Sequence, residues 1–279
     1  MMNQITRVKP SPMLQQIVKH FWFANIQADL SQGARCRILA DGLPGFIFQH
    51  NNGRSAISEA NGRALLLAFI YGQGIEPCIN IIKGNAFIVG GSFHTTALKQ
   101  FFGIDADVCT NVLVEADHVF DEPVLEQLLH APGPFAVIAL LESRLIKHMS
   151  AYKPHRLIEA TLNHIAYHIN HVRPESLPLH FNISSRQLQR KFKQHTGVSP
   201  ETYIRILKFQ RSLHLLTMGQ YEKLSDIGYQ LNYADQSHFI REFKYFSGIT
   251  PRDFLQQNDI RPILPVAGKR FEPLRLITA

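Results

Sequence analysis

The chain has 279 residues, of which 45% are hydrophobic and 18% charged, so it has a globular composition and enough length for two domains. Its three cysteines, Cys36, Cys78 and Cys109, are widely spaced, which argues against a disulfide framework and a CxxC zinc module. The N-terminus lacks the pattern of a signal peptide, and the apolar runs are too short to span a bilayer. We therefore expect a cytoplasmic protein without membrane segments.

The positive charge is concentrated in the C-terminal half. Residues 1–153 contain 12 of the 29 Lys and Arg residues and 12 of the 22 Asp and Glu residues, whereas residues 154–279 hold the other 17 and 10. The net charge of +7 therefore belongs to the second half. A basic domain beside a neutral one favours a polyanionic partner, nucleic acid before an anionic membrane, although a solvated basic surface would give the same balance.

The first half has the sequence pattern of strands separated by turns. Between about Phe21 and Phe93, short runs of Phe, Ile, Val and Leu alternate with clusters of Gly, Asn and Pro, as strands alternate with turns. The runs that we predict as strands are Gly45–Gln49, Ala64–Tyr71, Cys78–Lys83 and Ala86–Val89.

Two helices are predicted after these strands. Acidic residues and an early proline at 121–123 suit the start of a short helix that runs to Leu129. From Phe135 to Met149, apolar residues recur at steps of three and four, which indicates an amphipathic helix. We favour a helix that covers the β core of its own domain, and a helix that forms a dimer is the alternative.

The chain is predicted to divide into two domains and a tail. Lys153-Pro154 marks the boundary, because the sequence from there to Gln257 has helical periodicity, whereas the segment after Asp259 has too many prolines for a regular element. We expect an α+β chain with a β-rich domain at 1–150, an all-α domain of about seven helices at 154–258, and an extended tail at 259–279.

An internal repeat at an offset of 51 residues organises the helical domain. Leu188–Lys193 matches Phe239–Lys244, and the match continues from Gly197–Pro200 to Gly248–Pro251. Each copy reads Φ-x-Arg-x-Phe-Lys-x₃-Gly-Φ-[Ser/Thr]-Pro, where Φ is an apolar residue. Agreement at so many positions with one offset indicates a duplicated structural unit.

Each copy has the signals of a capped helix. Ser184 and Asp235, also 51 residues apart, can accept hydrogen bonds from the free N–H groups of a first turn. Gly197 and Gly248 can adopt the left-handed conformation that ends a helix. Ser-Pro or Thr-Pro then starts the next helix, with proline at its first position.

A shorter helix and a tight turn precede each capped helix. The short helices are predicted at 175–181 and 224–231, and Asn182 and Asn232, which tolerate positive φ, occupy the turns. Each copy is therefore a helix-turn-helix unit. A helix over residues 200–217, about 27 Å long at 1.5 Å per residue, can hold the two units about one DNA turn (~34 Å) apart.

The outer face of each second helix carries side chains that can read DNA. In this motif the second helix enters the major groove, where Arg pairs with guanine and Gln with adenine. Lys193 and Lys244 lie further along the helices and suit phosphates. The predicted base-reading side chains are Ser185, Arg186, Gln189 and Arg190 in the first unit, and Gln236, Ser237, His238 and Arg241 in the second.

The helical domain resembles the AraC/XylS family of bacterial transcription regulators over residues 155–259. The similarity is strongest in Ile227–Lys244 and Gly248–Pro251. The resemblance implies seven helices with two helix-turn-helix units, adds Gln187 to the DNA-binding residues, and implies RNA polymerase as a partner. Whether transcription is activated or repressed stays open.

The chain departs from the family pattern at four positions. It has Pro178 and Gly228 where the family usually has Ala in the first helix of each unit, and Asn182 and Asn232 where the turns usually have Gly. Proline lacks an N–H group, so Pro178 would distort its short helix unless it lies in the first turn.

Two functions are open for the β-rich domain. Residues 37–42 and 90–93 resemble parts of the sensor domains attached to some family members. We expect a site for a small-molecule effector, and the alternative is a module for homodimerisation or partner docking without ligand. A cavity of a few hundred Å³ would indicate the first, and a solid core the second. The candidate ligand-binding residues are Trp22, Arg37, Phe48, Tyr71 and His94.

No catalytic or metal site is predicted. His164, His168 and His171 have a spacing that can bind a metal, but no acidic or cysteine partner reinforces it, so an exposed histidine face is favoured. The segment Gly91–His94 lacks the second glycine of a nucleophile elbow. We therefore expect no enzyme activity, no cofactor and no bound metal.

Overall fold

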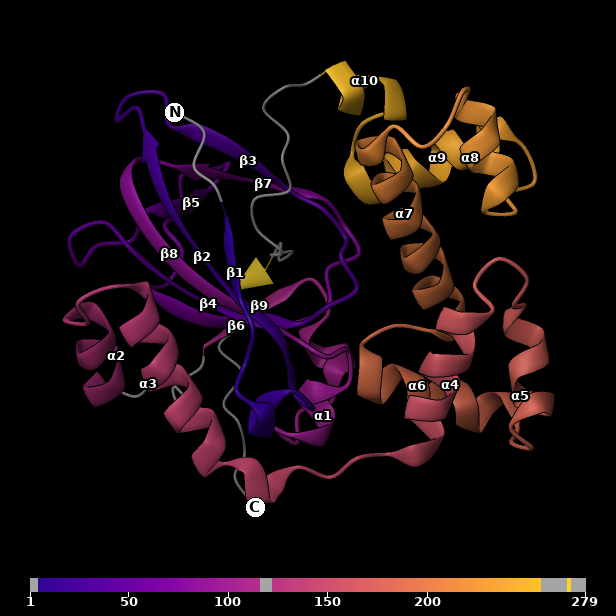
Figure 1. Ribbon diagram of the computed structural model, residues 1–279, viewed down its shortest axis with the longest axis horizontal. Coiled ribbons are helices and arrows are strands. Elements are labelled where there is room, and N and C mark those ends of the chain that lie inside the picture. Colours follow the sequence, from indigo (N-terminus) through magenta and orange to yellow (C-terminus); the bar gives the residue numbers. More distant parts are fainter. Residues whose placement is uncertain (1–4, 116–121, 257–269, 272–279) are drawn as a thin grey trace.

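The fold combines a β-rich half with a helical half. Figure 1 shows a computed structural model of the protein, which describes residues 5–115, 122–256 and 270–271. The strands and α1–α3 form one body, and α4–α10 form a second body beside it (Figure 1). The α+β prediction is confirmed, and residues 156–256, all of which are described, contain seven α-helices as expected.

The larger sheet forms the centre of the β-rich half. Its described strands follow the order β1-β2-β8-β4-β6-β9-β10, and all neighbours are antiparallel except β9 and β10. The long pair β2 and β8 is in register from Ala28 opposite Gly84 to His20 opposite Ser92, and the register shifts before Val18, which lies opposite Phe93. The strand bounds are β1 Thr6–Val8, β2 Val18–Ala28, β4 Gly45–His50, β6 Ala68–Tyr71, β8 Gly84–Phe93, β9 Val112–Glu115 and β10 Arg270–Phe271.

A smaller sheet packs against one face of the larger one. It contains β3 (Ala34–Ile38), β7 (Cys78–Ile82) and β5 (Ile57–Glu59), in the order β3-β7-β5. One hydrophobic cluster joins Trp22 and Tyr71 of the larger sheet to Ile38 and Ile82 of the smaller one, so the two sheets share a core.

The run predicted as a strand at Ala64–Tyr71 becomes a strand only at Ala68. The first part of the run crosses from one sheet to the other. The backbone N–H of Leu65 donates to Ile57 O at 2.9 Å, beside the smaller sheet, whereas Leu67 O accepts from Gln49 N–H at 2.7 Å, in the larger sheet. A continuous apolar run cannot reveal such a change of partner.

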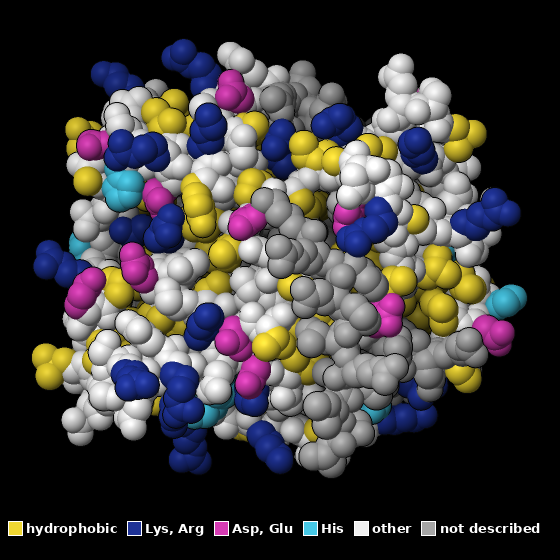
Figure 2. Space-filling view, turned by 180° about the vertical axis from the view of Figure 1, so that it is seen from behind, with side chains coloured by type: hydrophobic (Ala, Val, Ile, Leu, Met, Phe, Trp, Pro, Cys, Tyr) yellow, Lys and Arg dark blue, Asp and Glu magenta, His cyan; other side chains and the backbone are white. Residues whose placement is uncertain are grey.

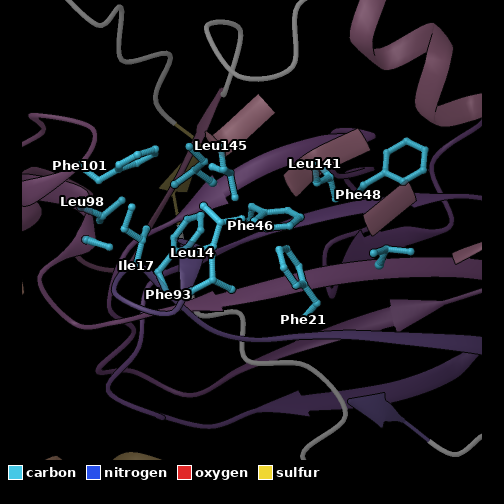
Figure 3. Packing of buried hydrophobic residues seen from close by; sticks show 14 of the residues in the cluster. Leu14, Ile17, Phe21, Phe46, Phe48, Phe93, Leu98, Phe101, Leu141 and Leu145 are labelled. Atoms are coloured by element: carbon cyan, nitrogen blue, oxygen red, sulfur yellow. The ribbon is translucent and has the colours of Figure 1, made fainter. Parts of the chain in front are cut away.

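Helices cover the other face of the larger sheet. Figure 3 shows Leu141 and Leu145 of α3 (Pro134–Lys147) in one cluster with Phe46 and Phe48 of β4. The short helix α1 (Ala97–Gln100) adds Leu98 to the same cluster, and α2 (Glu122–Leu129) packs against α3. The apolar side of the 135–149 segment therefore covers the β core of its own half, as favoured from the sequence.

The helical half has two hydrophobic cores that share one helix. The core of the first unit includes Leu188, Phe192 and Tyr203, and the core of the second includes Phe209 and Phe243. Tyr203 and Phe209 both come from α7. The helix bounds are α4 Arg156–Tyr167, α5 Leu177–His180, α6 Ser185–Thr196, α7 Pro200–Met218, α8 Leu224–Gln230, α9 Gln236–Ser247 and α10 Pro251–Gln256.

Most of the tail predicted at 259–279 lies outside the described residues, apart from the two residues of β10. Among the described residues, no helix is both long and apolar enough to cross a membrane.

Candidate nucleic-acid interface

The first helix-turn-helix unit consists of α5 and α6. A 3₁₀ turn at Pro174–Ser176 leads into α5, and Pro178 lies in the first turn of that helix, where its missing N–H group breaks no helical hydrogen bond. Asn182 makes the turn with φ 48°, as its side-chain type predicts. Ser184 then caps α6, because its Oγ accepts from the N–H of Gln187 at 3.3 Å.

The second unit repeats this geometry in α8 and α9. Asn232 makes the turn with φ 53°, and Asp235 caps α9 by accepting from the N–H of His238 at 2.6 Å. The two capped helices end at Gly197 and Gly248, with φ 86° and 77°. The repeat, both caps, both turns and both terminal glycines predicted from the sequence are confirmed.

The outer faces of the two capped helices are largely exposed. Leu188 and Phe192 of α6, and Phe239 and Phe243 of α9, are buried and fix which face of each helix points outward. Across the described part of the chain, Arg186, Arg190 and Arg241 form no hydrogen bond or ion pair with protein groups. The predicted residues that are exposed are Ser185, Arg186, Gln187, Gln189, Arg190 and Lys193 on α6, and Gln236, Ser237, Arg241 and Lys244 on α9.

His238 differs from the other predicted residues because it is half-buried. Its Nδ1 accepts from the N–H of Ala234 at 3.4 Å, and its ring lies 5.4 Å from the ring of Tyr233, measured between centroids. One edge of this imidazole is therefore used in the turn, and only the other edge is available to a ligand.

The long helix α7 holds both units. Its first turns pack Tyr203 against Phe192 of α6, with ring centroids 5.7 Å apart, and its middle packs Phe209 against Phe243 of α9 at 5.2 Å. With 19 residues it spans about 28 Å at 1.5 Å per residue. Figure 1 shows α6 near one end of α7 and α9 near the other.

An ion pair that the sequence analysis missed locks α9 onto α7. Arg205 donates from Nε and Nη2 to the two carboxylate oxygens of Glu242, at 2.7 and 2.9 Å. These hydrogen bonds raise the pKa of Arg205. Lys208, one turn along α7, donates to the carbonyl oxygen of Asn232 at 3.3 Å and so holds the turn of the second unit. The orientation of α9 therefore depends on polar contacts as well as on its apolar face.

Comparison with known families matches the two halves of the chain separately. Residues 179–257 match a helix-turn-helix domain family, and residues 6–115 match a domain of unknown function. The transcriptional activator RhaS of Salmonella arizonae is 33% identical over 88 residues, which are 32% of this chain and 31% of the relative. RhaS of Escherichia fergusonii is 34% identical over 106 residues, which are 36% of this chain and 38% of the relative. The helical domain is therefore an AraC/XylS-type helix-turn-helix domain. The matched region spans about a third of these curated relatives.

Two solved structures that are similar to this chain match different shares of it. The AraC-type regulator of Chromobacterium violaceum is 25% identical, with a TM-score of 0.33, and the match covers 37% of this chain and 91% of that chain. ToxT of Vibrio cholerae is 13% identical, with a TM-score of 0.42, and the match covers 91% of this chain and 97% of that chain.

Gly228, where AraC/XylS domains usually have alanine, gives a prediction about stability. A Cβ atom at this position of α8 would lie 3.7 Å from the Cβ of Phe239, an ordinary van der Waals distance. Gly228→Ala is therefore expected to raise the free energy of unfolding by about 0.5–1 kcal/mol, because alanine loses less backbone entropy in a helix. Urea denaturation measures the change.

Gly248→Ala is the control for that prediction. Gly248 has φ 77°, which alanine adopts only with strain, so this variant is expected to lose about 1 kcal/mol. A loss of stability in Gly228→Ala as well would show that α8 needs the small residue for its approach to α9.

The five candidate ligand-binding residues of the β-rich half do not converge on one cavity. Trp22 and Tyr71 lie together in the core between the two sheets, whereas Phe48 lies in the core on the opposite face, under α3. Arg37 donates from Nη1 to the carbonyl oxygen of Ser247 at 3.4 Å, and His94 lies in a cleft beside α4. Of these five residues, only Trp22 and Tyr71 lie in the same hydrophobic core.

Glycines bring the strands close to these two rings. A Cβ atom at Gly90 would lie 2.2 Å from the ring of Trp22, and one at Gly45 would lie 2.3 Å from the hydroxyl oxygen of Tyr71. Both rings are almost fully buried, and among the described residues the indole Nε1 has no hydrogen-bond partner. The two rings therefore fill the space between the sheets.

The β-rich half contacts the C-terminal end of the first recognition helix, α6. Thr110 donates from Oγ1 to the carbonyl oxygen of Gly197 at 2.7 Å. His195, which is buried at the same end of α6, lies close enough to Lys99 and Asp105 for their charges to act on it, and burial chiefly lowers its pKa.

The second unit is held in a similar way. Arg37 meets the carbonyl oxygen of Ser247 at the C-terminal end of α9, and Gln210 of α7 donates to the carbonyl oxygen of Ala40. Leu39 and Ala40 are part of the same hydrophobic core as Phe209. The AraC/XylS domain is therefore anchored at the C-terminal ends of both recognition helices, while their N-terminal ends stay exposed.

Proposed function

We propose that the protein is a transcription regulator that binds double-stranded DNA in the cytoplasm, with α6 and α9 in two successive major grooves. The observation that carries the proposal is the duplicated pair of capped helices, each of which leaves Arg and Gln side chains exposed near its N-terminal end. Such side chains suit base edges, and the length of α7 suits a separation near one DNA turn.

The distribution of charge supports the same assignment. Figure 2 shows one face of the molecule, with the helical half on the left. Many Lys and Arg side chains lie on this half, with Asp and Glu side chains among them. The net charge of the chain also belongs to residues 154–279. We assign DNA binding to a domain at 154–258, and control of that domain to residues 1–150.

Activation of transcription is the more specific form of the proposal. The relatives that match the helical domain are named transcriptional activators. An activator that binds beside a promoter needs a contact with RNA polymerase, and we propose the polymerase as a second partner of this domain.

The contacts between the two halves support control by the first half. Residues of the β-rich half meet both recognition helices at their C-terminal ends, so a change in that half would alter how α6 and α9 are presented to DNA. We propose that a small-molecule effector causes this change. The coupling free energy between effector binding and DNA binding is typically about 1–3 kcal/mol. Homodimerisation without a ligand is the alternative, and sedimentation at several concentrations distinguishes them.

Arg241→Ala and Lys244→Ala are expected to weaken DNA binding in different ways. Arg241 lies in the first half of α9, where a side chain can reach a base edge, whereas Lys244 lies one turn closer to its C-terminal end. Arg241→Ala should cost about 1–3 kcal/mol at the preferred site and relax selectivity at one base position. Lys244→Ala should weaken binding to all sequences alike. Fluorescence anisotropy with a panel of single-base operator variants measures both.

The salt dependence of the full chain is the control for these variants. Phosphate contacts release counterions, so the affinity for DNA should fall steeply between 50 and 200 mM salt. The slope of the logarithm of the binding constant against the logarithm of the salt concentration should be smaller in magnitude by about one in Lys244→Ala. A folded full chain that shows no salt-sensitive binding to duplex DNA would refute the proposed function. Equal losses in both variants, independent of sequence, would make Arg241 a phosphate contact.

A further inference from the structure

A cleft lies where the β-rich half meets the first helices of the helical half. Its volume is about 490 Å³. Its lining comes from Gln16 ahead of β2, His94 and Thr95 in the loop after β8, Tyr152 in the connecting segment, and the helices α4 and α7. A molecule bound there would touch both halves at once.

One side of α4 faces the cleft. Glu159, Leu162, Asn163 and Ala166 all line it, and their spacing of three and four residues places them on one face of the helix. This face combines a carboxylate, a carboxamide and two apolar side chains. Tyr203, from α7, also lines the cleft.

Among the described residues that line the cleft, His94 is the one basic side chain, and Glu159 is the one carboxylate. Within the described part of the chain, no Lys or Arg forms an ion pair with it. Its neighbour is the hydroxyl group of Tyr152, whose pKa is raised by burial and then by the nearby Glu159 carboxylate. A carboxylate at the wall of a cleft, with a neutral phenol beside it, provides acceptors for a cationic donor.

His94, which also lines the cleft, has a ring whose orientation is fixed by a hydrogen bond. The Nε2 atom of His94 lies 3.0 Å from the carbonyl oxygen of Gln15, a contact that requires N–H at Nε2 and leaves Nδ1 as an acceptor in the neutral ring. Burial lowers the pKa of His94, and the charge of Lys19 adds to this effect. Because the carboxylate of Glu159 is the negatively charged group of the lining, the cation belongs at its side of the cleft.

We propose that this cleft is a binding site for a small organic cation, an amine on a flat apolar body, with its ammonium group at Glu159 and its body against Leu162 and the rings of Tyr152 and Tyr203. The site is separate from the core between the two sheets. A ligand in this cleft would contact the β-rich half together with α4 and α7, so the proposal deepens the proposed function. Binding of the cation does not depend on that function, but a regulatory role of the cation does.

Phenethylamine is the probe for this site, and 2-phenylethanol, which has the same ring without the charge, is its neutral match. Titration calorimetry on the full chain is expected to show one phenethylamine site and at least tenfold weaker binding of the alcohol. Glu159→Gln, which keeps the shape of the side chain, should weaken the amine at least tenfold. Tyr152→Phe should weaken it less, because the ring remains.

Glu126→Gln is the matched control, since Glu126 is exposed on α2, away from the cleft, and the variant should bind the amine as the native chain does. Equal binding of amine and alcohol, or unchanged amine binding in Glu159→Gln, would overturn the proposal. DNA binding is measured on the same samples. Failure of the proposed function appears there as absent DNA binding, whereas failure of the cleft proposal appears only in the amine titration.

Discussion

Replacing Phe209 by alanine is expected to lower the free energy of unfolding by about 3–5 kcal/mol, because it removes a large ring from a closed core. Phe209 is fully buried on α7, and its ring centroid lies 5.2 Å from that of Phe243 and 5.5 Å from that of Phe246, both on α9. The cavity would separate α9 from the helix that fixes it. DNA affinity should therefore fall together with stability. Urea denaturation followed by circular dichroism measures the first effect, and fluorescence anisotropy the second.

Tyr229→Ala is the control for this variant. Tyr229 belongs to α8 of the same unit, but its side chain is 75% exposed, so its removal should change the free energy of unfolding by no more than about 0.5 kcal/mol. If Phe209→Ala lost less than about 1 kcal/mol, the ring could not be the contact that joins α7 to α9.

The helical half was predictable because its signals are local and occur twice. Ser184 and Asp235 act as caps through hydrogen bonds that reach only three residues along the chain, and Asn182 and Asn232 adopt positive φ within single turns. A repeat doubles the evidence for each of these positions. The exposed side of each recognition helix then followed from the spacing of its buried residues, such as Leu188 and Phe192.

Contacts between distant segments left no such signal. Glu242 pairs with Arg205, but the repeat places Lys191 at the equivalent position of the first unit, so the comparison of the copies gave no hint of an ion pair. In the β-rich half, the sequence predicts one ligand site from residue types alone and does not show which aromatic side chains share a face of the sheet. Phe48 and Trp22 face opposite sides of one sheet, a difference that depends on strand register.

The loop between β3 and β4, which contacts α7, is the site of the second large expected effect. Asp41 follows Ala40, whose carbonyl oxygen accepts from Gln210 of α7, and the Asp41 carboxylate accepts from the N–H of Leu43 at 3.0 Å. The carboxyl group is turned away from solvent, and this burial raises its pKa to about 7. No ion pair to Asp41 exists among the described residues, so its negative charge is poorly compensated above neutral pH.

Asp41→Asn is expected to stabilise the protein at pH 8 by about 2–4 kcal/mol, and to have little effect at pH 4. The folded state holds the proton more tightly than the unfolded chain, whose aspartate titrates near 4. The stability of the native chain therefore decreases as the pH rises from about 4 to 7, and asparagine, which keeps an acceptor for Leu43, removes that decrease. Burial lowers the pKa of His20 to about 4 and works in the opposite direction, but His20 is present in both chains and cancels in the difference.

Urea denaturation of the native chain and the variant across this pH range measures the difference, and Asp29→Asn is the control. Asp29 is exposed, and its hydrogen bonds to Ser31 and Gln32 lower its pKa, so its replacement should give no gain at pH 8. A loss of stability in Asp41→Asn at pH 8 would mean that the carboxylate is held by favourable contacts. A gain confined to high pH would show instead that the loop against α7 carries a strained charge, which makes the junction between the two halves sensitive to pH.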